Sequence, residues 1–332
     1  MPGDGSEWMA YSSLGVLDRL AALWAADASA ARCRSCMATL LCPSPESADE
    51  ETLQDGVMAG FPCRLMQVRI APHGRTDAPV LYRADVSCAL PRRDRVCCER
   101  IRLWLHPDAR GALRNCLDGI GASDLPRIGV FPTRGSLPMA IWLGASLDRV
   151  ILDSSALDAT VLREFLDGRR VAGLSMPGDI AWARTAVWRD ALGRIPEDLF
   201  QSAYFDRVQI RHGAGFGAGD ARLLAAWFRV HGVPAGQIVL EPEGTADTGI
   251  LACRLEMATG GARIELDWVP SGSGNPCGVT VHMLDAGGVR RTFRATGMGQ
   301  DAEYWIAEIR RNRRQSDQEA VLLAIGGPGR HS

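Results

Sequence analysis

Short apolar runs that alternate with helix-like segments are the feature of this sequence that most constrains its fold. In the first half, helical periodicity predicts helices at residues 13–27 and Pro107–Cys116. Apolar runs predict strands at Cys36–Cys42, Cys63–Ile70, Leu81–Ala89, Ile101–Leu105, Pro138–Leu143 and Arg149–Leu152. Strands that alternate with helices are typical of α/β domains. We therefore expect an α/β, sandwich-like N-terminal domain with a mixed or parallel sheet.

The second half has a different pattern. Asp179 is placed to cap a helix that runs to about Arg194, and a last helix is expected from Asp301 to about Ala324. Between them, a strand at Phe205–Arg211 and a helix at Asp220–His231 precede a strand-rich stretch, Gln237–Arg294, broken by Gly, Pro and Ser clusters. This predicts a C-terminal α+β domain with an antiparallel sheet. The expected divisions are a helical extension at 1–30, an α/β domain at 31–174 and an α+β domain at 175–332.

Composition and charge exclude several classes of function. The net charge of -2 lacks the basic surplus that a nucleic-acid binder needs. The sequence contains no lysine, so a Walker-A phosphate loop and Schiff-base chemistry are both excluded. Residues 1–10 do not have the pattern of a secretory signal, and no apolar run is long enough to span a bilayer. We expect a cytoplasmic protein with no nucleic-acid or membrane partner.

A glycine-rich turn at Gly213–Gly217 suggests a nucleotide site. It follows a predicted strand, precedes a predicted helix, and lies upstream of a second strand that ends at Glu241. This is the outline of a dinucleotide fingerprint. However, Arg207–Arg211 alternates polar and apolar residues, whereas the first strand of a dinucleotide domain is buried on both faces. A flexible turn is favoured, and an NAD(P)-binding oxidoreductase that uses this turn is the alternative.

The cysteines allow two further interpretations. Cys33 and Cys36 have the spacing of a redox pair or a zinc knuckle. A structural zinc site needs a second knuckle, and Cys97 and Cys98 would point to opposite faces of a strand. Packing in a reduced interior is favoured, and Cys33 and Cys36 are kept as candidate redox thiols.

No catalytic constellation is recognisable. The sequence lacks the nucleophile-elbow pattern Gly-x-Ser-x-Gly, and its six histidines are scattered without metalloprotease spacing. We therefore predict no catalytic, cofactor-binding or metal-binding residues, and we expect that the chain is not an enzyme.

The segment Asp179–Arg189 suggests a surface for a partner. Trp182 and Trp188 lie about 120° apart around a helix, so both sides of the helix must be covered. Arg184 is four residues before Trp188, a spacing that allows stacking. A core helix is the favoured interpretation. The candidate interface residues are Trp182, Arg184, Trp188 and Arg189.

In order along the chain, several segments resemble the OpcA family, the glucose-6-phosphate dehydrogenase assembly proteins of bacteria. The resemblance covers roughly residues 14–280 and includes an early apolar strand followed by a Pro-x-Arg turn. The matching segments are Cys36–Cys42, Pro62–Arg64, Val96–Ile101, Leu137–Trp142, Asp148–Ser154, Asp179–Arg184 with Trp188–Arg189, and Leu223–Trp227.

The resemblance implies a non-catalytic partner protein. Its expected function is to bind glucose-6-phosphate dehydrogenase, to favour the active oligomer of that enzyme and so to support the oxidative pentose phosphate pathway. The mechanism would be allosteric activation through tighter binding to the active form. No cofactor is expected, and self-association is left open.

Overall fold

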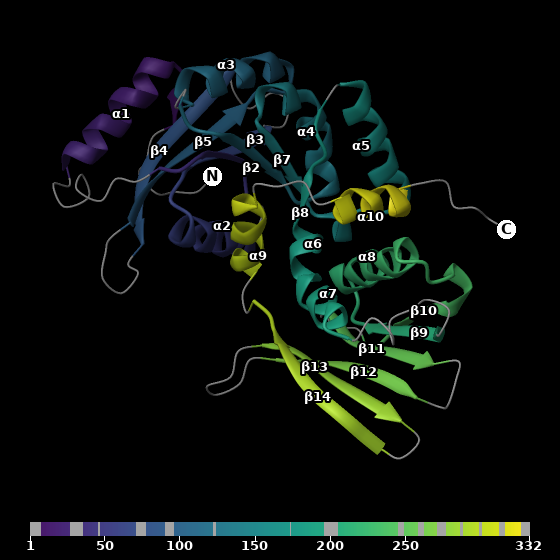
Figure 1. Cartoon of the computed structure of the whole chain (residues 1–332). Coiled ribbons are helices and arrows are strands. Elements are labelled where there is room, and N and C mark those ends of the chain that lie inside the picture. The colour runs from purple at the N-terminus through teal and green to yellow at the C-terminus, as the bar shows by residue number, and fades with distance from the viewer. Residues whose placement is uncertain are drawn as a thin grey trace. The chain divides into compact units, whose positions relative to one another are not determined.

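The computed structural model describes residues 8–26, 36–45, 47–70, 78–89, 96–121, 124–172, 174–195, 205–244, 249–257, 262–270, 277–285, 288–298, 301–311 and 316–326. The chain divides into two units (Figure 1). Unit 1 contains residues 1–131, 135–151 and 172–177. Unit 2 contains residues 132–134, 152–171 and 178–332.

Unit 1 is built on a largely parallel sheet. Its strands lie in the order β1-β4-β5-β3-β2-β6-β7. Strand β2 pairs in parallel with both β3 and β6, β3 pairs in parallel with β5, and β4 is antiparallel to β5. The strand bounds are β1 Met9–Ala10, β2 Thr39–Pro43, β3 Arg64–Ile70, β4 Val80–Ala89, β5 Val96–Leu105, β6 Arg127–Phe131 and β7 Arg149–Leu152.

The central strands of unit 1 are buried on both faces, which explains their nearly continuous apolar sequences. Leu40, Leu41, Leu65 and Met66 are all at most 2% exposed. The helices of the unit are α1 Ser13–Ala26, α2 Ala48–Gly60, α3 Arg110–Ile120 and α4 Leu137–Leu143.

A buried ion pair crosses the sheet of unit 1. Arg64 Nε donates to Glu99 Oε2 over 2.6 Å, and Trp24 Nε1 donates to Glu99 Oε1 over 2.8 Å. Glu99 is 4% exposed and Arg64 is 7% exposed. Their mutual bonding allows both charges to remain in the interior, where an unpaired charge would be costly.

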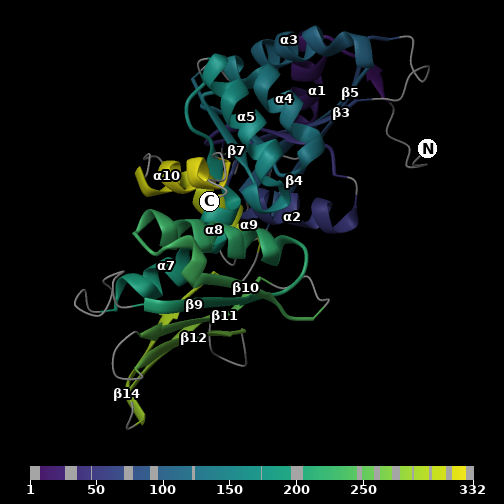
Figure 2. The ribbon, with the colours of Figure 1, turned by 90° about the vertical axis from the view of Figure 1, so that its right-hand side faces the viewer.

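Unit 2 is built on a second sheet with the strand order β10-β9-β11-β12-β13-β14 (Figure 2). Strand β10 is parallel to β9, and the other neighbours are antiparallel. The bounds are β9 Phe205–His212, β10 Ile238–Pro242, β11 Ile250–Met257, β12 Arg263–Val269, β13 Gly278–Asp285 and β14 Gly288–Thr296. Unit 2 also contains a two-residue strand, β8 Gly178–Asp179, which leads directly into helix α6 (Ile180–Arg184).

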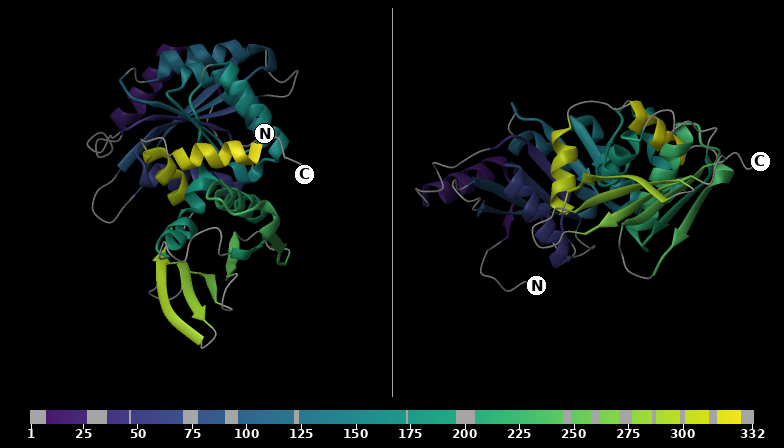
Figure 3. Two further views of the ribbon diagram at one scale, coloured as in Figure 1. Left: turned by 45° about the vertical axis from the view of Figure 1, so that its right-hand side comes forward. Right: turned by 60° about the horizontal axis from the view of Figure 1, so that its bottom comes forward.

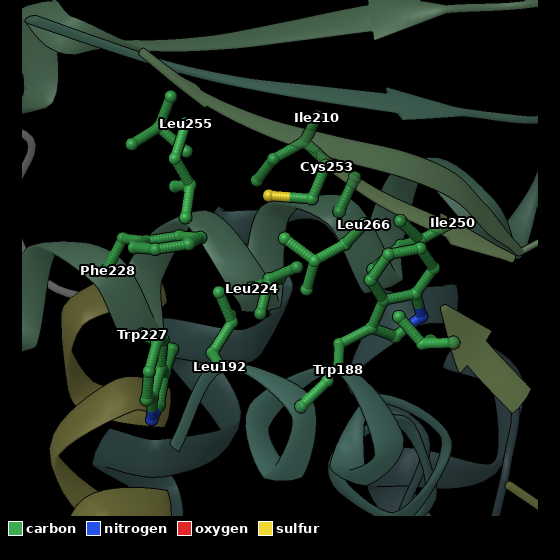
Figure 4. Packing of buried hydrophobic residues seen from close by; sticks show 14 of the residues in the cluster. Trp188, Leu192, Ile210, Leu224, Trp227, Phe228, Ile250, Cys253, Leu255 and Leu266 are labelled. Atoms are coloured by element: carbon green, nitrogen blue, oxygen red, sulfur yellow. The ribbon is translucent and has the colours of Figure 1, made fainter. Parts of the chain in front are cut away.

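Helices α7 Ala186–Gly193 and α8 Phe216–Val230 pack against one face of this second sheet. The other helices of unit 2 are α5 Ala159–Val171, α6 Ile180–Arg184, α9 Asp301–Arg310 and α10 Ser316–Gly326. Trp188 and Leu192 of α7, with Leu224 and Phe228 of α8, face apolar side chains of the sheet such as Leu255 (Figure 4). Helix α10 lies beside α8 (Figure 3).

The predicted fold class is confirmed, since unit 1 has a mixed, largely parallel sheet and unit 2 combines helices with a mainly antiparallel sheet. In β9, Val208 and Ile210 are fully buried while Arg207 and Arg211 are exposed, as the alternating sequence predicts. None of the helices among the described residues is long and apolar enough to cross a membrane.

Three elements differ from the prediction. The last helix, expected from Asp301 to about Ala324, is divided into α9 and α10. Pro138–Leu143 was predicted as a strand and is helix α4, because Pro138 fits the first turn of a helix and Leu137, Ala140 and Leu143 bury one helical face. Asp179 is an N-cap as predicted, and its side chain accepts a hydrogen bond from the Ala181 N–H. The helix that it begins is divided at Thr185 into α6 and α7.

Candidate functional site

A cavity of about 660 Å³ lies within unit 2 and is the candidate site. Its wall comes from α6, α7, α8, α9 and the ends of β11 and β12. It is mainly aromatic and apolar, with a few polar groups, as is usual for small-molecule sites. The lining residues that matter here are Arg184, Trp188, Phe216, Asp220, Gly249, Trp268, Cys277, Asp301 and Tyr304.

The glycine-rich turn borders this cavity. It connects β9 to α8, and α8 leads to β10, which is parallel to β9. Gly215 has a φ of 61°, which favours glycine, and it is exposed. The Gly213 N–H donates to the Gly249 carbonyl over 3.1 Å, and both Gly249 and Phe216, the first residue of α8, line the cavity. A strand–turn–helix–parallel strand unit therefore opens towards a space of ligand size.

Gly219 holds the first turns of α8 close to the segment Ser154–Ala156. A Cβ at this position would lie 2.3 Å from both the Cα and the carbonyl oxygen of Ser155. Any larger residue would push the helix away from that backbone. Glycine is therefore needed here to bring Asp220 towards its partners near Ser155.

Arg184 is the centre of a buried polar network. Its Nη1 and Nη2 donate to the two carboxylate oxygens of Asp153 over 2.8 Å and 2.9 Å. Its Nε and Nη2 also donate to Asp220 over 3.0 Å and 3.1 Å, and Nη2 donates to Ser155 Oγ over 2.6 Å. Burial opposes its charge, but Asp153 and Asp220 more than compensate and raise the pKa of Arg184. The guanidinium is fixed in position and permanently charged.

Two carboxyl groups near Arg184 hold protons more tightly than usual. Burial raises the pKa of Asp220 to about 6, although Arg184 opposes the shift. Burial, followed by the charge of Asp153, raises the pKa of Asp179 to about 7. Asp179 accepts hydrogen bonds from Ser154 N (2.9 Å), Ser154 Oγ (2.7 Å) and Ala181 N (3.1 Å). Acid–base chemistry near neutral pH is thus available beside the cavity.

The four residues proposed as an interface have internal contacts in the structure. Trp182 and Trp188 are only 2% and 3% exposed. Arg184 and Trp188 line the cavity, whereas the Arg189 guanidinium stacks 3.5 Å above the Trp182 ring. Arg184 lies 5.2 Å above the ring of Phe216, a neighbour that sequence spacing could not reveal. No observation tests a partner role for these residues, and that role stays a prediction.

Of the two candidate redox thiols, Cys33 lies outside the described residues and Cys36 lies in unit 1. Cys36 is half-buried, its thiol donates to the Ala38 carbonyl over 3.4 Å, and burial raises its pKa, which disfavours a reactive thiolate. A pair that the sequence analysis missed is Cys63, the residue before β3, and Cys98 in β5. A hydrogen bond from Cys63 lowers the pKa of Cys98 to about 7. Across the described part of the chain, no cluster of His, Cys, Asp and Glu is suited to hold a metal ion.

Unit 1 has the strand order of a dinucleotide-binding domain but not its phosphate site. The order β5-β3-β2-β6-β7 matches the 3-2-1-4-5 order of such domains. Their ligands bind at the carboxyl ends of the two strands where the order reverses, which are β2 and β6 here. Helix α2 starts there with Asp49, Glu50 and Glu51 in its first turn. The preceding residues, 43–47, contain no glycine. Acidic groups at this helix end repel a pyrophosphate, so these residues do not fit a dinucleotide.

The turn in unit 2 fits a dinucleotide better. Gly213, Gly215 and Ala218 match the G-x-G-x-x-G/A spacing. The first turn of α8 contains no acidic residue, so the positive end of its helix dipole is not neutralised there. Glu241 is near the end of the second parallel strand, where such sites place the acid that binds a ribose.

No protein-family model matches the chain, and no curated protein matches it either. Among solved structures, the chain is similar to KijD10, a 3-ketoreductase from Actinomadura kijaniata in complex with NADP and TDP-benzene. The identity is 9%, the match covers 88% of this chain and 95% of that one, and the TM-score is 0.49.

Two further similar structures are oxidoreductases. The aldose-aldose oxidoreductase from Caulobacter crescentus is 10% identical, with 87% of this chain and 94% of that chain covered and a TM-score of 0.46. A putative NADPH-dependent oxidoreductase from Desulfitobacterium hafniense is 9% identical, with 88% and 93% covered and a TM-score of 0.45.

These structures correct the resemblance drawn from the sequence. They are oxidoreductases and not OpcA-type assembly proteins. The identification as an OpcA protein was therefore wrong, as were the role of assembly factor and activator of glucose-6-phosphate dehydrogenase and the expectation of a non-enzyme. Since the identities are near 10% and the TM-scores are 0.45–0.49, the function of this chain is argued below from its own residues.

Proposed function

We propose that this protein is an NAD(P)-dependent oxidoreductase that binds its nucleotide at the turn Gly213–Gly217. The observation that carries the proposal is the position of this turn. It lies between a parallel strand and a helix, and it borders a cavity of about 660 Å³. The polar strand before the turn argues against a dinucleotide sheet, whereas phosphate binding would depend on the turn and on the start of α8.

Phosphate binding would use the backbone of the turn. Gly215 is exposed and has a positive φ. Because it has no side chain, a pyrophosphate could approach the main chain closely there. The α8 dipole adds partial positive charge at the same place. Glu241, whose carboxylate is partly exposed and lies 3.5 Å from Arg207, would accept hydrogen bonds from a ribose.

The cavity would hold the reacting groups. A bound nicotinamide supplies hydride transfer. Asp220, with a pKa of about 6, can hold or release a proton at the oxygen of an alcohol or carbonyl substrate. Arg184 keeps the Asp220 carboxylate in place through two hydrogen bonds, and the rings of Trp188 and Trp268 exclude water.

A cytoplasmic location is part of this proposal. Seven cysteines are free thiols, which suits a reducing compartment; they are Cys36, Cys42, Cys63, Cys98, Cys116, Cys253 and Cys277.

The direct test is nucleotide binding by wild-type protein and by Gly215→Trp, measured as the shift in thermal midpoint with NAD and with NADP. The wild type should gain several degrees at saturating nucleotide, because a ligand that binds only the folded state stabilises it. The variant should lose this gain, because the indole fills the approach to the turn.

Gly288→Trp is the matched control. Gly288 also has a positive φ, 119°, and is exposed, but it is the first residue of β14, at the opposite edge of the sheet from β10 and Glu241. Both variants therefore introduce the same residue at an exposed position with positive φ. The proposal fails if the wild type shows no shift with either nucleotide, or if Gly215→Trp responds as strongly as Gly288→Trp.

A further inference from the structure

The charged groups of the cavity are mostly negative. Asp220 and Asp301 belong to its wall, and Asp153 lies directly behind Arg184. Arg184 is the single basic side chain in the described lining, and it already binds both Asp153 and Asp220. Its positive charge is therefore neutralised by its own partners, and the wall as a whole has excess negative charge.

The titration of neighbouring groups agrees with this sign. Burial raises the pKa of Tyr304, and the charges of Cys277, Asp301 and Asp220 raise it further. Tyr304 lines the cavity, and its hydroxyl donates to the Met298 carbonyl over 2.9 Å. Burial is the main cause of this shift; the carboxylates Asp301 and Asp220 add to it in the direction expected of a negative wall, and Arg184 opposes it.

Aromatic rings provide the rest of the wall. Trp188, Trp268 and Tyr304 come from α7, β12 and α9, so they surround the space from different elements. Their faces are the negative side of the ring quadrupole, and tryptophan offers the strongest attraction for a cation. Phe216 already faces Arg184 at 5.2 Å. Trp188 packs mostly in the core, whereas Trp268 and Tyr304 are only partly buried and keep ring surface for a ligand.

We propose that this cavity binds an organic cation of the pyridinium type, so that it favours the oxidised, positively charged nicotinamide ring over a neutral ring. Excess carboxylate charge and several aromatic faces are the two features by which proteins recognise such cations. The same features disfavour a phosphorylated or carboxylate ligand within the cavity. This inference rests on the proposed function, because it assigns the cavity to the nicotinamide end of the nucleotide.

Two small probes test the inference without the phosphates. 1-Methylnicotinamide is a cation, and nicotinamide is a neutral molecule of nearly the same shape. Both are titrated into the full chain in the millimolar range, with tryptophan fluorescence as the readout and Trp188→Phe to identify the reporting ring. We expect the cation to bind about 10-fold more tightly than the neutral probe, as cation–π and charge attraction at a partly desolvated site predict.

A pair of matched variants then tests the source of the preference. Asp301 and Asp317 are both exposed acids in the first turn of a C-terminal helix, but only Asp301 lines the cavity. Asp301→Asn should reduce the ratio of the two affinities several-fold, and Asp317→Asn should leave it unchanged. Equal reductions would overturn the assignment.

The remaining outcomes separate this inference from the function. If both probes bind equally, or if neither binds while NADP still raises the thermal midpoint, the cation preference is wrong and the nucleotide site stands. If neither the probes nor NAD or NADP bind, the proposed function and the inference fall together.

Discussion

Asp179→Asn gives the sharpest test of the buried charge network. Asp179 is 0% exposed, and its two oxygens accept three hydrogen bonds from Ser154 and Ala181. Asparagine has the same shape. Its carbonyl oxygen can accept from both backbone N–H groups, and its amide can donate to the Ser154 hydroxyl. The substitution therefore removes the titration of the group and retains its packing.

The size of the effect follows from the pKa. Burial and the Asp153 charge raise the pKa of Asp179 from 3.8 to about 7. About three units correspond to about 4 kcal/mol, at about 1.4 kcal/mol per unit. Because the pKa is higher in the folded state, the stabilisation from the bound proton is complete below about pH 4 and is lost as the pH rises through 7. Asparagine does not ionise, so the variant should avoid this loss.

The assay is urea unfolding of the full chain at pH 4.5 and pH 8, followed by tryptophan fluorescence. The free energy of unfolding of Asp179→Asn, relative to wild type, should rise by about 3 kcal/mol between these conditions, because pH 4.5 is slightly above the pKa of the unfolded carboxyl. Asp206→Asn, at an exposed position of β9, is the control and should follow the wild type. If Asp179→Asn and wild type change in parallel with pH, Asp179 is ionised in the folded protein at low cost, and the argument from burial is refuted.

Two further substitutions, one with a matched control, test the site. Gly219→Ala should lower the free energy of unfolding by several kcal/mol, because its Cβ would meet the Ser155 backbone at 2.3 Å. The control is Gly193→Ala, which has nothing within 4 Å of its Cβ and should be neutral or stabilising by up to about 1 kcal/mol. Similar changes in the free energy of unfolding for both variants, measured by chemical denaturation, would contradict the close approach of α8 to Ser155. Arg184→Met leaves the buried carboxylates of Asp153 and Asp220 without their cation and should lower the free energy of unfolding by about 3–5 kcal/mol, measured as a lower thermal midpoint. A decrease below about 1 kcal/mol would show that the two carboxylates do not need the Arg184 charge.

The fold was predictable where the local pattern and the tertiary role agree. The continuous apolar run ending at Cys42 predicts a strand covered on both faces, and β2 is such a strand. The alternation at Arg207–Arg211 predicts a strand with one solvent face, which β9 confirms. Pro138–Leu143 was assigned to the wrong element because a short apolar run has no clear periodicity, and Pro138 was given too little weight as a first-turn residue.

The cavity could not be predicted from the sequence, because distant segments form it. The partners of Arg184 are Asp153, 31 residues before it, and Asp220, 36 residues after it. Neither aspartate belongs to a recognisable motif, and no spacing rule connects them. The one local signal was the glycine turn. It was discounted because the strand before it is half exposed, although phosphate binding depends on the turn and the helix end rather than on that strand.

The residues that suggested an assembly protein explain why that resemblance misled. Glu99, from the Cys-Cys-Glu segment, accepts hydrogen bonds from Trp24 and Arg64 in the interior of unit 1. Asp153 and Arg184, from two other matching segments, bind each other in unit 2, and Asp179 caps a helix. These residues hold strands and helices together, so their order along the chain reports an arrangement of elements. Such an arrangement can support many functions, and only the groups around a site can distinguish among them. Here those groups are the glycine turn, the aromatic wall and the carboxylates beside Arg184.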